Sequence, residues 1–145
     1  MPPAFTPRPP PKYYSGDVHW IDHSRHSGPN SQNTLKDPHY AVILTSNNLL
    51  MNPAYPLVNY VPMTSFKKDQ HWDEKREALI YPTNVLLKVA EYTQQERAID
   101  KDTIVDCGQV HTCDIGIFND FRFRLNKNDL LKIRAKLTTI LGYGV

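Results

Sequence analysis

Short apolar runs separated by polar turns make up most of the chain, and this spacing predicts strands rather than helices. Residues 39–46 contain four consecutive apolar residues, Ala41 to Leu44, which is the pattern of a short buried strand. Other runs that alternate apolar with polar residues, or are rich in β-branched and aromatic side chains, predict strands at 16–22, 57–63 and 83–90, one or two within 103–114, and an amphipathic edge strand at 121–125.

Only the last segment has helical periodicity. Its apolar positions recur every three or four residues, at Leu130, Ile133, Leu137 and Ile140. Asn126 or Asn128 can cap the start of this helix, and Gly142 can end it in left-handed geometry. Many short strands followed by one helix predict a mainly β (α+β) fold, a barrel-like sheet closed by a C-terminal helix, rather than alternating βαβ units.

The segments between the predicted strands differ in character. Residues 1–13 are rich in proline and are expected to be a disordered tail before a folded domain at 14–145. Residues 23–36 are polar and form a long loop, and 47–55 form a turn or one helical turn. Residues 66–81 carry charges of both signs that cancel, which indicates a solvated loop or a short helix.

Two strand positions call for irregular backbone. Pro62 has no amide hydrogen, so we expect it near a strand end or on an edge strand, where no ladder donor is needed. Gly108 lies within 106–109 and predicts a kink in the strand region that surrounds it.

The composition is that of an ordinary globular chain. It has 145 residues, 40% hydrophobic and 22% charged, with a formal charge of +2 and a pI near 8.5, which permits nucleic-acid binding without requiring it. The sequence has no apolar run of about 18 residues and no secretory signal pattern, so we expect no membrane association. Cys107 and Cys113 do not make a disulfide framework, which favours a reduced, cytoplasmic protein.

Few residues have the types and spacings typical of catalytic or metal-binding sites. His19, His23 and His26 lie close together, but they lack the helical spacing and the glutamate of a zinc protease, so we expect no metal site. The chain contains neither a phosphate-binding glycine loop nor a Gly-x-Ser-x-Gly motif. His39 at a loop–strand boundary and His111 near the glycine kink remain as candidates for acid–base chemistry, with Thr64 just after a strand.

Five segments, in order, resemble the MazF/PemK (Kid-like) toxins of bacterial type II toxin–antitoxin pairs. Residues 16–22 resemble the opening Gly-Asp-(Ile/Val)-x-Trp strand of that family, and residues 39–45 its Arg-Pro-x-Val-Val-Leu-Ser strand. Residues 60–65 resemble its Val-x-Pro-x-Thr-Ser segment, and 107–114 its acidic-Gln-x-Arg-Thr-Ile-Asp segment. With the C-terminal helix, the resemblance covers about residues 14–143.

The resemblance implies an SH3-like β-barrel with a C-terminal helix, usually a homodimer. It implies metal-free endoribonuclease cleavage of single-stranded RNA, with no cofactor. It also implies a cognate antitoxin whose disordered tail covers the RNA groove.

This chain departs from the family at the positions that matter for catalysis. His39 and His111 stand where the family has arginines, Tyr40 replaces a proline, and Gly108 replaces an acidic residue, whereas Thr64 is kept. An arginine cannot give up its proton near neutral pH, but a histidine can act as either acid or base.

The working hypothesis is a ribonuclease in which His39 and His111 form an acid–base pair and Thr64 holds the phosphate, with attack by the RNA 2′-hydroxyl. The expected RNA contacts come from the adjacent loops and strand ends, at His23, Ser65, Lys67, Lys68 and Gln109. The alternative is a non-catalytic member of the same fold that binds nucleic acid or a protein, for example a topoisomerase inhibitor.

Overall fold

The computed structural model describes residues 12–22 and 38–142. Within these ranges the elements follow in the order β1 (Asp17–Ile21), β2 (His39–Ile43), α1 (Asn47–Leu50), β3 (Leu57–Ser65), α2 (Lys68–His71), β4 (Trp72–Asp73), β5 (Ala78–Leu79), β6 (Asn84–Leu87), β7 (Thr103–Asp106), β8 (His111–Asp114), β9 (Phe121–Arg124) and α3 (Lys127–Ile140). Short 3₁₀ helices occupy Val89–Glu91 and Ile115–Ile117. The predicted loop at 23–36 and nearly all of the predicted tail at 1–13 lie outside the described residues, and the domain division stays a prediction.

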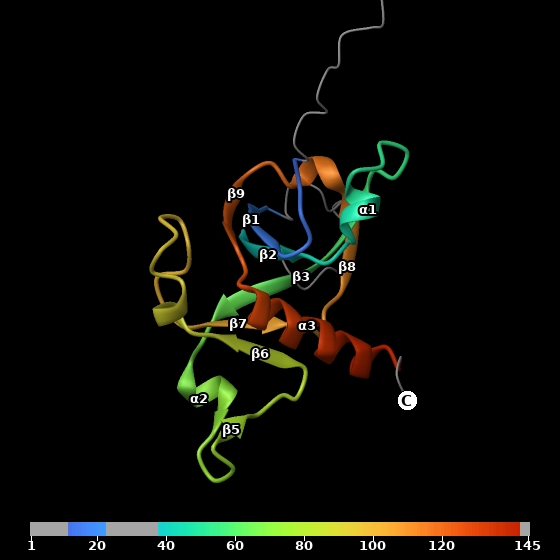
Figure 1. Ribbon diagram of the computed structural model, residues 1–145. Helices are drawn as coiled ribbons and strands as arrows, with labels where there is room; N and C mark the ends of the chain where they lie inside the picture. Colours follow the sequence, from blue (N-terminus) through green and yellow to red (C-terminus); the bar gives the residue numbers. More distant parts are fainter. Residues whose placement is uncertain (1–11, 23–37, 143–145) are drawn as a thin grey trace, which may run out of the picture.

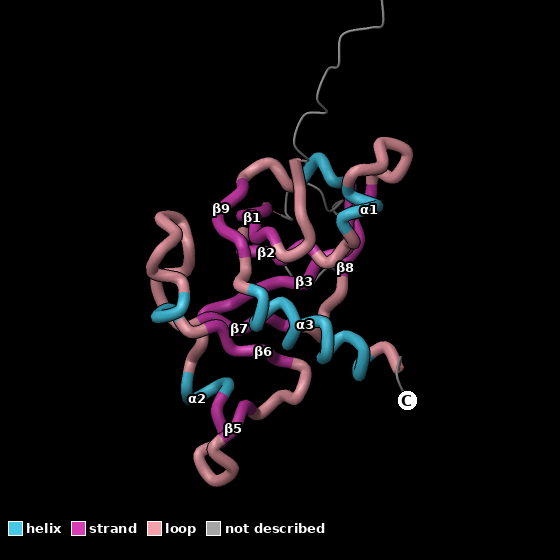
Figure 2. The backbone as a smooth tube through the Cα atoms, viewed as in Figure 1, coloured by secondary structure: helices cyan, strands magenta, loops and turns pink. Residues whose placement is uncertain are grey.

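Seven of these strands form one antiparallel sheet in the order β6-β7-β3-β2-β1-β9, in which β8 also pairs with β3, and β4 and β5 form a separate two-stranded sheet. The sheet is curled, and α3 lies alongside β6 at one end of it (Figure 1). Strand β9 is an edge strand, as its alternation of aromatic and cationic residues predicts. The tube view shows how much of the chain is strand and how α3 stands out as the one long helix of the described part (Figure 2). The expected mainly β fold with a C-terminal helix is confirmed.

Strand β3 is the centre of the sheet, because it changes partner along its length. Its first half pairs with β8, from Leu57 to Tyr60, and its last three residues pair with β7, starting at Met63. Pro62 is therefore not near a strand end or on an edge strand, as expected from the sequence, but inside β3, opposite Ala41. It is accommodated because it lies at the break between the β8 and β7 ladders, where neither ladder needs a donor.

The break between β7 and β8 confirms the predicted kink. A turn at Cys107 and Gly108 interrupts what would otherwise be one strand along β3. The Asp106 carboxylate fixes this turn, since its Oδ1 accepts the backbone amide of Gly108 at 3.1 Å and its Oδ2 accepts the Gln109 side chain at 2.6 Å.

Each face of the sheet has its own apolar cluster, because side chains alternate between the faces along a strand. The cluster beneath α3 includes Val42, Val61, Val105 and Ile133. The opposite cluster is smaller and gathers around Tyr60, with Ile21, Ala41, Ile43, Val58 and Phe118 among its buried members.

Helix α3 is held to the sheet by its first turn. The Asn126 side chain accepts the Asp129 amide at 2.7 Å, so of the two predicted caps Asn126 is the one used. Gly142 follows the helix at φ +77°, the left-handed geometry predicted for its end. Tyr92 donates its hydroxyl to the buried Asp129 carboxylate at 2.6 Å and ties the start of α3 to the 88–102 connection.

Residues 66–81 are more ordered than a solvated loop. They form α2 and then the β4–β5 hairpin, an arm that projects from the end of the sheet (Figure 1). Asp73 shapes the hairpin turn by accepting the backbone amide of Lys75 and the Arg76 side chain. No helix among the described residues is long and apolar enough to span a membrane.

Candidate active site

The strand register places the three predicted catalytic residues on the same face of the sheet. Ala41 pairs with Pro62, so His39, two residues before Ala41, shares a face with Thr64, two residues after Pro62. His111 pairs directly with Tyr60, which lies on that face as well. This is the face of the smaller apolar cluster, opposite the face that α3 covers.

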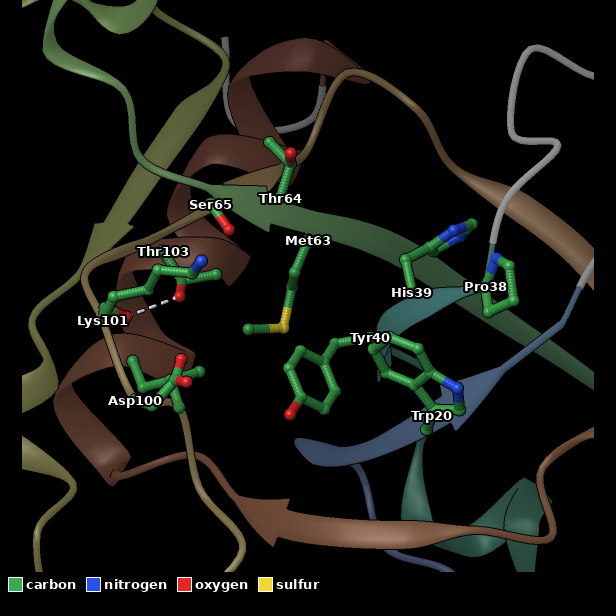
Figure 3. Close-up of a pocket in the computed structure, with 11 residues that line it drawn as sticks. Trp20, Pro38, His39, Tyr40, Met63, Thr64, Ser65, Asp100, Lys101 and Thr103 are labelled. Atoms are coloured by element: carbon green, nitrogen blue, oxygen red, sulfur yellow. Dashed lines mark hydrogen bonds between the residues drawn. The ribbon is translucent and has the colours of Figure 1, made fainter.

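His39 and Thr64 border one pocket. The pocket has a volume of about 320 Å³, and its lining includes both residues together with Pro38, Ser65 and Lys101. Figure 3 shows that the side chains of His39 and Thr64 point away from the ring of Tyr40. This arrangement follows from strand alternation, because Tyr40 belongs to the opposite face.

His111 lies outside this pocket. Its ring stacks on the buried ring of Tyr60, with the centroids 5.4 Å apart and the planes at 25°. Strands β2 and β8 flank β3 on opposite edges, so His39 and His111 are separated by two strand spacings, about 10 Å across the sheet. They are also offset along β3 by the distance from Tyr60 to Thr64, about 13 Å. The structure therefore brings His39 and Thr64 together and sets His111 apart.

The surroundings of His111 favour its neutral form. Burial lowers the pKa of His111 below its usual value, and the negative charge of Asp106 opposes this effect only in part. A neutral imidazole can accept a proton, so the structure suits His111 to the role of a base rather than an acid.

The residues predicted to contact RNA have different surroundings. Ser65 lines the pocket beside Thr64. Lys67 is exposed, whereas the ammonium group of Lys68 forms an exposed ion pair with Glu74 at 3.1 Å. Gln109 uses its side-chain amide to hold Asp106. His23 lies outside the described residues.

Lys101 and His71 lie near the site but are not among the residues that the sequence predicts. Lys101 belongs to a connection that looks merely polar in sequence, yet it lines the pocket of His39 and Thr64. His71 lies in α2 and lines a second cavity that also touches Thr64. Its Nδ1 accepts the backbone amide of Lys67 at 2.8 Å, so Nε2 carries the proton when the ring is neutral. Neither position follows from local periodicity.

The cysteines are poor nucleophiles in this fold. Burial raises the pKa of Cys107 and of Cys113 to about 12, which keeps both thiols protonated at neutral pH. In the described part of the chain, no group of three or more His, Cys, Asp or Glu side chains is arranged to hold a metal ion. His19 is described, but His23 and His26, which lie near it in sequence, are not.

Comparison with known proteins points to one family. Residues 14–141 match the model of a family described as PemK-like, MazF-like toxin of type II toxin–antitoxin system. No protein with a curated description matches the sequence.

Several solved structures have the same fold. An endoribonuclease from a mycobacterial species superposes with a TM-score of 0.61 at 15% identity, over 92% of this chain and 94% of that one. MazF from Deinococcus radiodurans gives 0.61 at 18% identity, over 90% and 96%. A mycobacterial endoribonuclease in complex with its cognate antitoxin gives 0.59 at 15% identity, over 92% and 96%. At these identities the likeness is one of fold, and it confirms the predicted barrel-like sheet with a C-terminal helix.

Proposed function

Because the chain belongs to the PemK-like, MazF-like toxin family of type II toxin–antitoxin systems, we propose that it is an endoribonuclease that cuts single-stranded RNA without a metal ion. The observation that carries this proposal is the placement of His39, Thr64 and His111 on one face of the sheet. That face offers two imidazoles and a hydroxyl along β3, where an extended RNA strand can lie.

The proposed reaction begins with the RNA 2′-hydroxyl. His111, neutral because of its burial, takes the proton of this hydroxyl, and the oxygen attacks the neighbouring phosphorus. The bond from phosphorus to the 5′-oxygen breaks, and His39 in its protonated form gives that oxygen a proton. The products are a 2′,3′-cyclic phosphate and a 5′-hydroxyl. The Thr64 hydroxyl donates to a non-bridging phosphate oxygen while charge builds up there.

The strand spacing sets a condition on this mechanism. His39 and His111 stand on opposite sides of β3 and are offset by about 13 Å along it, so both rings must turn toward each other over β3 to reach the same phosphate. Lys101 lines the pocket of His39 and Thr64 next to Asp100, and we propose that its ammonium group contacts the phosphate backbone. Ser65, Lys67, Lys68, Gln109 and His23 are proposed to contact the flanking nucleotides.

The proposed partners follow from the family and its solved relatives. Two of those relatives are a mycobacterial endoribonuclease with its cognate antitoxin and a MazE–MazF complex from Deinococcus radiodurans. We propose that this chain likewise has a cognate antitoxin, acts as a homodimer and works in the cytoplasm without a cofactor.

Cleavage of a mixed-sequence RNA in excess EDTA tests the activity. The wild-type protein is expected to produce fragments ending in 2′,3′-cyclic phosphate, and one 2′-deoxy substitution at the cut site should block the cut. His39→Gln and His111→Gln should each lower the rate by about 10²–10⁴-fold. Thr64→Val should also lower the rate, because it removes the hydroxyl that donates to the phosphate, and Thr93→Val, at an exposed position outside the site, is its control. Loss of activity in EDTA, or full activity of both histidine variants, would contradict the mechanism.

The pH profile tests the assignment of roles. Because the pKa of His111 is lowered, the midpoint of the acid limb in the pH profile of kcat/KM should lie below pH 6.5. The His111→Gln variant should lack that limb. If RNA binds and no product forms on prolonged incubation, the chain is instead a non-catalytic binder, and inhibition of a topoisomerase becomes the next assay. Growth arrest on expression, relieved by a protein encoded next to it, tests the toxin–antitoxin role independently.

A further inference from the structure

A second cavity lies on the other side of Thr64 from the His39 pocket. It has a volume of about 220 Å³ and lies among β3, β6, β7 and the arm formed by residues 66–81. The lining residues used below are Thr64, His71, Tyr81, Asn84, Ile104 and Asp106. The cavity is small, so it can take a single ring system and not a peptide or a helix.

Asn84 is the first sign that this cavity binds something. Its side chain lines the cavity, and the residue is only 7% exposed. Its carboxamide makes no hydrogen bond with any described residue. The donors and the acceptor of this carboxamide are therefore unused at the wall of the cavity, where a ligand can form hydrogen bonds with them.

Asp106 supplies the complementary group. It pairs with Asn84 across the β6–β7 ladder, so the two side chains are neighbours on the same face as Thr64. Its carboxylate oxygens already accept Gly108 and Gln109, one each, and every carboxylate oxygen can accept a second hydrogen bond. Together the pair offers amide donors and acceptors beside a fixed carboxylate acceptor.

The mouth of the cavity has two planar side chains. Tyr81 is 56% exposed on the rim. The His71 ring is held in place by the backbone amide of Lys67 and by the ring of Phe66, with ring centroids 5.9 Å apart. An exposed, positioned aromatic ring beside polar hydrogen-bonding groups is the arrangement that receives a splayed nucleobase.

We infer that this cavity takes one base of the RNA strand whose phosphate lies at Thr64, and that it selects bases with an exocyclic amine over uracil. The amine of cytosine, adenine or guanine donates to Asp106, while Asn84 donates to a neighbouring ring nitrogen or carbonyl of the same base. Uracil has no amine, and the one donor on its pairing edge, N3–H, lies between two carbonyl oxygens that the carboxylate repels. The inference rests on the proposed function, since it assumes that the ligand is RNA.

Binding is tested apart from cleavage, with 5′-mononucleotides as the probes. In a ¹H–¹⁵N NMR titration, CMP, AMP and GMP should shift the side-chain amide signals of Asn84 and bind at least about fivefold tighter than UMP. Asn84→Ala should remove that preference. Tyr81→Ala, at an exposed position that does not carry the fold, should weaken all four, and Tyr81→Phe should restore binding. Tyr55→Ala, on a different loop, is the matched control.

A cleavage experiment distinguishes this inference from the proposed function. Sequencing the cut ends of a randomised RNA should show depletion of uracil at one position near the cut, and Asn84→Ala should lose this depletion while still cutting. If the nucleotides bind with the stated preference but RNA is not cleaved, the proposed nuclease activity is refuted while the base-binding cavity is supported. An unchanged cut profile in both Asn84→Ala and Tyr81→Ala, or equal binding of UMP, would overturn the pocket.

Discussion

The Tyr92→Phe substitution, which removes one hydroxyl at the start of α3, should lower the stability of the whole domain. Tyr92 follows a short 3₁₀ helix, and its ring packs against Phe123 with the centroids 5.4 Å apart. Its hydroxyl donates to Asp129, which is 1% exposed, at 2.6 Å, and accepts the backbone amide of Asn126 at 3.2 Å. Burial and the bond to Asp129 raise the pKa of Tyr92, so the hydroxyl stays a donor at any ordinary pH.

The magnitude follows from what Tyr92→Phe leaves behind. A hydrogen bond to a buried charged group is worth about 1.5–3 kcal/mol, and an amide that loses its acceptor adds to the cost. Lys132 remains 3.9 Å from the other Asp129 oxygen and limits the loss. We expect the free energy of unfolding to fall by about 2–3 kcal/mol, which lowers Tm by roughly 5–10 °C in a domain of this size.

Urea unfolding followed by tryptophan fluorescence measures this change, at one protein concentration because dimer formation adds to stability. Tyr55→Phe is the control, since that hydroxyl makes no hydrogen bond with a described residue. A double-mutant cycle with Asp129→Ala should give a coupling free energy above about 1 kcal/mol. A Tyr92→Phe protein within about 0.5 kcal/mol of wild type would refute the reasoning. The consequence reaches the site, because the connection after Tyr92 carries Lys101 to the pocket wall.

Other perturbations test other parts of the fold. His19 is 3% exposed, and burial lowers its pKa, so the folded state resists its protonation; stability should decline as pH falls below 6.5, and His19→Leu should reduce that slope in denaturation curves taken from pH 7.5 to 5. Gly16 has φ +90°, and a Cβ there would come within 3.0 Å of a leucine of α3. Gly16→Ala should therefore lower the free energy of unfolding by more than the roughly 1–2 kcal/mol that left-handed backbone strain alone costs. Gly142→Ala, which has open space around it, should stay within that range in the same assay. A pKa of about 12 leaves Cys107 and Cys113 with roughly 10³-fold less thiolate than ordinary thiols. Both should therefore react with a thiol reagent at pH 7.5 far more slowly in the folded protein than in the unfolded protein. Fast reaction of the folded protein would contradict their burial.

Local pattern alone was enough to predict the strands of the main sheet and the C-terminal helix, although not the β4–β5 hairpin. The apolar run that begins at Ala41 became β2, the alternation at 121–125 became an edge strand, and the helical stripe at the C-terminus became α3 with Asn126 as its cap. These predictions succeed because each depends on residues close together in the chain, whose periodicity records which face is buried. The kink at Gly108 belongs to the same class.

Only the tertiary structure decided which residues meet. Pro62 lies inside β3 because that strand changes partner from β8 to β7. The predicted pair of His39 and His111 is split because β2 and β8 lie on opposite sides of β3. His71 and Asn84 come beside Thr64 through the arm and the β6–β7 ladder. Strand order and register join segments that are far apart in sequence, and no local periodicity encodes that choice, because it is set by which apolar faces can be buried together.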